Sequence, residues 1–435
     1  MRAFQQFERA VFERLAGDVD SNGEPEDDGG LTPGAVACEA SSFTRHAASL
    51  SATKLADGLL DPKLVLSWLL SNAGASSVLT GLLVPIREAG SLLPQLMIAP
   101  RVHAMARRQW AWSAGSFVQG AACAGIAAAG LLLDGNAAGV VICLLLAVLA
   151  VGRAACSVSH KDVLRKTIGT SRRGASTGFA SSTASVGVVV FALLLMLGTP
   201  SRYVIVIAAL IVAAALWLVA AAIFATIGEE PTPSEVTSTP WSQLRLLREV
   251  PQLRRFIVVR GFLTSTALAP PYLVLLAAGG GEDVVTQLGS LVLASAAASL
   301  LSSYVWGRLS DRSSRAVLQF SGIAGAAALG LAVVLDVMGL SGTWWAVPLT
   351  LFGVMLGYHG VRQGRSIYLV DMAPEDDVAA YTAVANTVIG VLLIGSGIFG
   401  ALASLAGAQV TVGLFAAMSL SAAVVAIGLR EVEST

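Results

Sequence analysis

The chain has 435 residues, of which 55% are hydrophobic and only 13% are charged, and its 28 basic and 28 acidic residues give a formal net charge of zero. A soluble chain of this length would carry charged surfaces on two or three domains, so the composition excludes that class of protein. Long apolar runs recur instead, each close to the roughly 20 residues with which a helix crosses a bilayer. We therefore predict a multi-pass membrane protein.

The first predicted span, residues 43–60, is the least apolar one, because it contains charged side chains that include Lys54 and Asp57. Pro62 follows directly and is expected to end or kink the helix, since proline has no backbone N–H and its ring clashes with the preceding turn. We expect residues 65–70, beyond this proline, to lie near the outer interface.

Eleven further spans are predicted at residues 74–99, 109–133, 138–159, 174–198, 202–227, 255–278, 284–306, 316–337, 342–368, 381–406 and 410–429. Within the seventh span, Pro270–Pro271 predicts a break. The longest internal polar stretch separates the sixth span from the seventh and is typical of a linker between two helical bundles. The predicted divisions are a tail (1–42), a six-helix bundle (43–227), a central linker (228–254), a second bundle (255–430) and a short tail (431–435).

Basic residues gather in every second loop, which indicates how the chain is oriented. The loops after the second, fourth, sixth and eighth spans contain Arg101, Arg107, Arg108, Lys161, Arg165, Lys166, Arg172, Arg173, Arg245, Arg248, Arg254, Arg308, Arg312 and Arg315. The alternate loops hold little positive charge beyond Lys63 and Arg202. Cytoplasmic loops carry the excess of Lys and Arg, so we predict that these basic loops and both termini are cytoplasmic.

The basic loop after the eighth span reads Gly-Arg-Leu-Ser-Asp-Arg-Ser-Ser-Arg and runs from Gly307 to Arg315. It resembles the loop motif G-x-L-A-D-R-x-G-R-R of the major facilitator superfamily, with matches at Gly307, Leu309, Asp311, Arg312 and Arg315. The resemblance implies an all-α membrane protein of about twelve transmembrane helices in two pseudo-symmetric six-helix bundles. It also implies a secondary transporter that works by alternating access. In such a loop the charges form a network that breaks and re-forms as the bundles rock.

An internal repeat supports this arrangement. The fourth span ends with Arg153, Ser157 and Asp162, and the tenth ends with Arg362, Ser366 and Asp371, at one constant offset (362 − 153 = 209). The same offset places the charged loop at Gly307 opposite the basic loop after the second span. We therefore predict a duplicated bundle. Asp162 and Asp371 are expected to belong to charge networks at helix ends, alongside the loop motif.

Charged side chains inside the spans are the candidates for proton coupling, because burying one costs a few kcal/mol or more unless it serves a cavity or a partner. Asp57 and Glu88 are the leading carboxylates. Lys54 lies one turn before Asp57, could pair with it, and is a further candidate for proton coupling that would tune the carboxylates. Arg153 resembles the fourth-span arginine with which many proton-coupled members of the family modulate a nearby carboxylate.

The candidates for lining a solute cavity are polar residues within the spans, namely Arg87, Gln119, Arg260, Asn386 and, near the inner end of the tenth span, Arg362 and Arg365. For most of these residues a second interpretation stays open. Arg362 and Arg365 could instead snorkel to the cytoplasmic interface, whereas Gln119 and Asn386 could knit neighbouring helices together.

Several function classes lack their characteristic motifs. The sequence contains no phosphate-binding G-x-x-x-x-G-K-[ST] loop, no pattern typical of a hydrolase or metal site, and no long basic tract for nucleic acid. We predict no enzyme activity, no cofactor and no metal. The sequence favours a monomeric, proton-coupled secondary transporter of the bacterial inner membrane, with an anionic or zwitterionic small solute. The alternative is a membrane receptor or assembly factor that kept this fold and lost transport.

Overall fold

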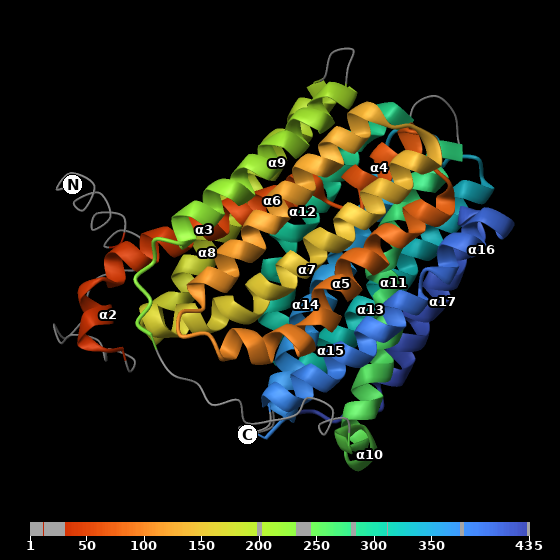
Figure 1. Cartoon of the computed structure of the whole chain (residues 1–435). Helices are drawn as coiled ribbons and strands as arrows, with labels where there is room; N and C mark the ends of the chain where they lie inside the picture. The colour runs from red at the N-terminus through yellow and green to blue at the C-terminus, as the bar shows by residue number, and fades with distance from the viewer. Residues whose placement is uncertain are drawn as a thin grey trace.

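The computed structural model describes residue 12 and residues 31–197, 202–231, 245–279, 284–310, 312–374 and 378–432. Within these ranges the regular structure is entirely helical (Figure 1). The first half contains α2 (Pro33–Ala37), α3 (Glu39–Leu60), α4 (Val65–Asn72), α5 (Ser77–His103), α6 (Gln109–Leu132), α7 (Gly135–Thr167), α8 (Thr170–Leu197) and α9 (Arg202–Phe224). The second half contains α10 (Leu246–Glu249), α11 (Pro251–Gly279), α12 (Val284–Ser310), α13 (Ser314–Val337), α14 (Ala346–Met372), α15 (Val378–Gly395), α16 (Ile398–Ala406) and α17 (Ala408–Ala426).

Eight helical stretches in the described ranges are long and apolar enough to cross a membrane: α6, α7, α8, α9, α11, α13, α15 with α16, and α17. Four further crossings are made by α3 with α4, α5, α12 and α14. Three of these four carry charges inside the predicted spans, among them Asp57, Glu88 and Arg362. Hydropathy is lower there because these helices contribute polar side chains to the interior.

The first crossing is longer than predicted, because α3 and α4 form it together. Helix α3 ends at Leu60, where Pro62 cannot continue the hydrogen-bond ladder, and the Asp61 carbonyl accepts the N–H of Val65 at 2.9 Å as α4 begins. Residues 65–70, predicted to lie near the outer interface, are all buried within the protein, and their depth in the membrane stays a prediction. Helix α4 packs against α5 and α11, and so completes the crossing inside the protein.

The predicted break in the seventh span was wrong. Helix α11 runs without interruption from Pro251 to Gly279 and includes both Pro270 and Pro271. Transmembrane helices tolerate proline where neighbouring helices enclose the freed backbone groups. Here the surrounding turns are buried against α14 and α17, so packing holds the helix in register through both prolines.

The helices pack as two sets. In the first half α7 packs on α5 and α6, while α3 packs on α8 and α9. The second half repeats this pattern, with α14 against α12 and α13, and α11 against α17. The two sets meet where α5 faces α15 and α16, and where α8 faces α12. This is the arrangement of two six-helix bundles, and their boundaries at residues 227 and 255 remain a prediction.

Glycines bring the two sets into close contact at one end. A Cβ atom on Gly81 of α5 would lie 2.7 Å from the Cα atom of Gly400 in α16. A Cβ atom on Gly289 of α12 would lie 2.8 Å from the backbone nitrogen of Met196 in α8. This closed end contains α4 and α16, at upper right in Figure 1, whereas α2 and α10 lie towards the opposite side. Only glycine permits so close an approach of two backbones.

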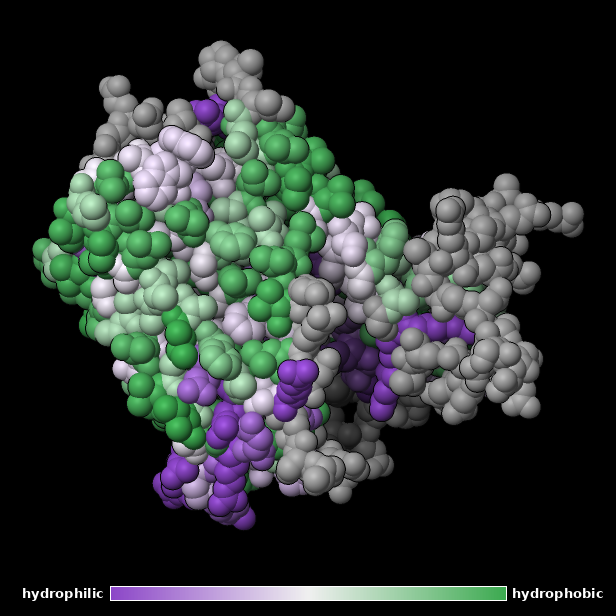
Figure 2. All heavy atoms as spheres, turned by 180° about the vertical axis from the view of Figure 1, so that it is seen from behind, coloured by the Kyte–Doolittle hydropathy of each residue, from purple (hydrophilic) through white to green (hydrophobic). Residues whose placement is uncertain are grey.

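The outer surface is apolar, as contact with lipid requires. Figure 2 shows that hydrophobic residues cover most of the visible face, and that hydrophilic residues gather mainly at its lower end. Large side chains on the outer faces of several helices are strongly exposed, for example Leu132, Leu144 and Leu405. An apolar surface of this extent marks a membrane contact, so the chain is a multi-pass membrane protein.

Candidate functional site

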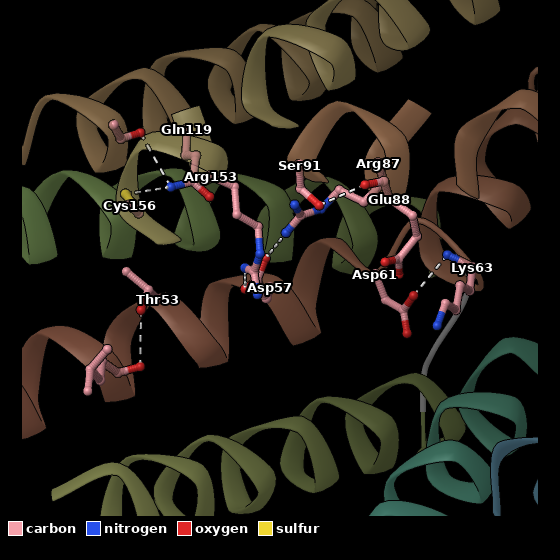
Figure 3. Close-up of polar contacts among 12 residues, drawn as sticks. Thr53, Asp57, Asp61, Lys63, Arg87, Glu88, Ser91, Gln119, Arg153 and Cys156 are labelled. Carbon is pink, nitrogen blue, oxygen red and sulfur yellow. Dashed lines mark hydrogen bonds and ion pairs between the residues drawn. The ribbon is translucent and has the colours of Figure 1, made fainter. Parts of the chain in front are cut away.

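Three helices of the first half bring one carboxylate and two guanidinium groups together. Asp57 lies near the last turn of α3, Arg87 lies on α5 and Arg153 lies on α7. Figure 3 shows both arginines pointing at Asp57, and each forms a direct ion pair with a different carboxylate oxygen. Charge-assisted hydrogen bonds of this kind are about twice as strong as neutral ones. We call these three residues the Asp57 centre.

The predicted pairing of Lys54 with Asp57 was wrong. Although the two residues are three positions apart on α3, the Lys54 ammonium group donates to the Thr177 carbonyl oxygen at 3.1 Å and to the Ser181 hydroxyl group of α8. Two arginines from other helices occupy both oxygens of Asp57, so the lysine binds its nearest polar neighbours instead. Spacing on one helix therefore gave the wrong partner.

Arg87 and Glu88 point in different directions, as adjacent helical positions must. Arg87 faces Asp57, whereas the Glu88 carboxylate lies beside Asp61 and Lys63 (Figure 3). Glu88 forms no ion pair with any residue that the structure describes, yet it interacts electrostatically with Lys63, Arg362 and Arg365. This carboxylate therefore faces the second half of the molecule.

Lys63 belongs to the site, although the sequence suggested only an outer loop. It lies between α3 and α4 and is 8% exposed, and its backbone N–H donates to an Asp61 carboxylate oxygen at 2.8 Å. Its ammonium nitrogen lies 3.3 Å from the ring centroid of Tyr358 in α14, which is a cation–π contact between the two halves. The signal was the charged Asp-Pro-Lys sequence at a helix break, because such a break within an apolar run turns polar groups inward.

The second half contributes three arginines. Arg260 of α11 is 5% exposed and donates to the Asn386 side-chain oxygen of α15 at 2.9 Å. Arg365 interacts electrostatically with Arg260 and with Glu88. Arg362 lies 5.9 Å from the Tyr358 ring centroid and interacts with Lys54 across the two halves. All three guanidinium groups thus lie towards the first half.

Gln119 lies elsewhere. It is buried in α6, and its amide group donates to the Gly115 carbonyl oxygen at 3.3 Å and to the Cys156 sulfur atom of α7 at 3.4 Å. The second contact joins α6 to α7, so Gln119 supports the packing of two helices of the first half.

Ion pairs also join the helix ends far from the closed end. Asp162 near the end of α7 pairs with Arg108 before α6 at 2.9 Å. The buried Glu229 after α9 pairs with Lys166 at 2.7 Å and accepts the backbone N–H of Gln109 at 2.7 Å. A carboxylate at the N-terminus of a helix also opposes the positive end of its dipole. Glu229 was not among the residues predicted from the sequence, although an acidic residue directly after an apolar span was a signal for it.

The loop motif takes part in a similar contact in the second half. Arg315 pairs with Glu431 at 2.7 Å, and the Ser313 hydroxyl group, which caps α13, donates to the same carboxylate at 2.7 Å. Gly307 belongs to α12, Arg312 lies in the turn before α13, and Asp371 lies near the end of α14. Asp311 lies outside the described residues. Glu229 after α9 thus binds the start of α6, and Glu431 after α17 binds the start of α13. These two helix starts occupy corresponding places in the two halves.

Twelve crossings in two sets, with charged residues between them, define a polytopic transporter-like membrane protein. The sequence profile of the Major Facilitator Superfamily matches residues 53–361. The chain therefore belongs to the major facilitator superfamily of membrane transporters. No functionally curated protein matches it in sequence.

Solved structures of transporters share this fold. The nucleoside transporter NupG is 11% identical and superposes with a TM-score of 0.68, covering 90% of this chain and 100% of its own. A peptide transporter POT in complex with sulfate is 12% identical, with a TM-score of 0.67 and coverage of 96% and 97%. The inward-open xylose transporter XylE from E. coli is 10% identical, with a TM-score of 0.64 and coverage of 92% and 98%. At such low identity the likeness concerns the fold alone.

Proposed function

We propose that this protein is a proton-coupled secondary transporter that moves a small anionic or zwitterionic solute across the bacterial inner membrane. It acts as a monomer, with both termini in the cytoplasm. The two bundles rock about the charged interior, so that this interior faces one side of the membrane and then the other. The closed end described above corresponds to one of these two states.

The Asp57 centre is the observation that supports the proposal most strongly. A carboxylate that pairs with two arginines holds α3 against α5 and α7 while it is ionised. A proton on Asp57 removes the negative charge, so both ion pairs lose most of their attraction and the three helices are free to shift. Proton binding and helix movement are thereby coupled through one residue.

Glu88 is the second candidate for the proton. It lies outside any ion pair of the described residues and faces cations of the second half. A change in its charge would alter the attraction between the bundles, whereas a change at Asp57 alters contacts within the first bundle. We therefore expect substitutions of Asp57 and of Glu88 to have different effects on helix movement.

The excess of arginine and lysine in the interior supports an anionic or zwitterionic solute. Lys63 and Arg260 are nearly buried, Arg365 lies within electrostatic range of Arg260, and Arg362 lies near the same Tyr358 ring as Lys63. Buried cations are stable only when anions or strong acceptors compensate them. A wholly apolar interior would have favoured the non-transporting receptor, and the charges found here argue against that alternative.

Proteoliposomes that contain a pH-sensitive dye test the proposal. Pools of small metabolites are added outside, and solute-dependent acidification or alkalinisation is followed for the wild type, Asp57→Asn and Glu88→Gln. We expect at least one pool to move protons in the wild type and at least a tenfold loss in Asp57→Asn. Asp134→Asn, which changes an exposed loop carboxylate, is the matched control. If no pool moves protons, or if Asp57→Asn and Glu88→Gln both behave as the wild type, proton coupling at this site is contradicted.

A further inference from the structure

The two halves differ at one position in a way that bears on the solute. Pro62 and Pro271 are separated by the same offset as Arg153 and Arg362 (271 − 62 = 209). The offset therefore aligns α3 with α11 as well as α7 with α14. With this alignment Thr266 takes the place of Asp57, and Arg362 takes the place of Arg153. The second half thus has the arginine without the carboxylate that balances it in the first half.

No other carboxylate of the described residues forms an ion pair with this arginine or its neighbours. Lys63, Arg260, Arg362 and Arg365 are all absent from ion pairs within those ranges. Two carboxylates lie near them: Asp61, which accepts the Lys63 backbone N–H, and Glu88. Four positive and two negative charges leave an excess of two positive charges in this cluster, and the neighbouring Asp57 centre, with two arginines on one carboxylate, adds a third.

Burial makes this excess costly. Arg260 is 5% exposed, and its Nε–H group has no acceptor among the described atoms. It also lies within electrostatic range of the like-charged Arg365, which in turn repels Arg362. Lys63 and Arg260, which are 8% and 5% exposed, need a counter-anion because their desolvation is otherwise uncompensated, and the exposed Arg362 adds to the positive charge of the cluster. The Asp57 centre contains such an anion, whereas no described carboxylate of the second half forms an ion pair with these cations.

On the basis of the proposed function, we infer that Lys63, Arg260, Arg362 and Arg365 bind the anionic end of the transported solute, and that this end is a compact dianion of the phosphate-monoester class. Guanidinium groups match phosphate oxygens in paired hydrogen bonds, and a lysine adds a point charge. A phosphate monoester carries about 1.5 to 2 negative charges near pH 7, which offsets most of the excess. Because these arginines lie close enough to interact with one another, one compact dianionic group can contact them together. A solute with one carboxylate at each end would place its two charges too far apart for this.

Thermal unfolding of the purified full-length protein in detergent tests this inference without requiring transport. The probes are glycerol 1-phosphate and glucose 6-phosphate as monoesters, inorganic phosphate, malate as a dicarboxylate, lactate as a monoanion, and glycerol as a neutral compound. We expect at least one monoester at saturation to raise the Tm by about 3 °C, and lactate and glycerol to leave it unchanged. An equal rise with inorganic phosphate would assign the site to the phosphate group alone, which still supports the inference.

Variants show whether the binding occurs at these residues. Arg362→Gln and Arg365→Gln should each weaken monoester affinity at least tenfold, and the first changes an exposed side chain, which folding tolerates. Arg255→Gln is the control, since Arg255 donates to the Gly428 carbonyl oxygen at the end of α17 and lies outside the cluster. The inference is overturned if no monoester stabilises the protein, if malate or lactate does so equally, or if both variants bind as tightly as the control. Solute-dependent proton movement in proteoliposomes would in those cases leave the proposed function standing, whereas its absence removes that function as well.

Discussion

Asp57 shows what a single carboxylate can do when three helices converge on it. Its two oxygens bind arginines from α5 and α7, so one protonation event bears on two helix contacts. Arg153 keeps 43% of its side chain exposed, which leaves the centre accessible from the interior. The ionised Asp57 centre therefore links α3 to α5 and α7, whereas the protonated centre releases these contacts.

Lys54 and Arg153 provide the sharpest comparison at this scale. Lys54→Gln leaves both ion pairs of Asp57 intact, because the lysine bonds to α8 instead. Arg153→Gln removes one of them. We expect solute-dependent proton movement in proteoliposomes to stay within about twofold of the wild type for Lys54→Gln and to fall at least tenfold for Arg153→Gln, since a lost charge-assisted bond is worth about 1.5–3 kcal/mol. Equal losses in the two variants would contradict the assignment of partners.

The buried ion pair of Glu229 predicts a stability difference. Glu229→Gln leaves Lys166 without its counter-charge and removes the carboxylate that faces the start of α6. We expect the free energy of unfolding in detergent to fall by about 3 kcal/mol, as for other buried pairs that lose one partner. Glu249→Gln breaks the exposed pair with Arg245 and serves as the control, with a change of about 0.5 kcal/mol or less. Similar values for the two variants would show that the Glu229 network does not stabilise the fold.

At the scale of helices, the break between α3 and α4 positions the site. It carries Lys63 inward to Tyr358, and the resumed helix buries residues 65–70. The sequence allowed us to predict that a helix ends near Pro62, because proline acts locally. It did not show that the next turn stays inside the protein, because that depends on α5 and α11, which lie far along the chain.

Gly81 tests the closed end. A single methyl group there would meet the Gly400 backbone at 2.7 Å, so Gly81→Ala should prevent the two sets of helices from closing. We expect transport to fall at least tenfold while the protein still elutes as a folded species on size-exclusion chromatography. Gly330→Ala is the matched control, because a Cβ atom at Gly330 meets nothing within 4 Å. Normal transport by Gly81→Ala would show that this contact is not part of the cycle.

For the whole molecule, sequence and structure agree most closely where the physics is local. Apolar length predicted the twelve crossings, and the motif at Gly307–Arg315 indicated the family that the sequence profile confirms. The partners of individual charges could not be predicted, because Asp57, Arg87 and Arg153 meet only through the packing of three helices. For the same reason the contact of Lys63 with Tyr358 had no counterpart in the sequence analysis.

The central claim is that the two bundles expose the charged interior alternately. Pulsed electron–electron double resonance measures it most directly, with spin labels on a variant whose four native cysteines are replaced. One pair of labels sits at the closed end, on the exposed Asn72 and Leu405, and a second pair at the opposite end, on the exposed Ala106 and Arg430.

The distances are compared between the wild-type background and Asp57→Asn, which mimics the protonated carboxylate, each with and without a solute pool that moves protons. We predict that at least one of these changes shifts the two distances in opposite directions, one end opening as the other closes. Two distances that stay fixed under every condition, or that change in the same direction, would contradict alternating access.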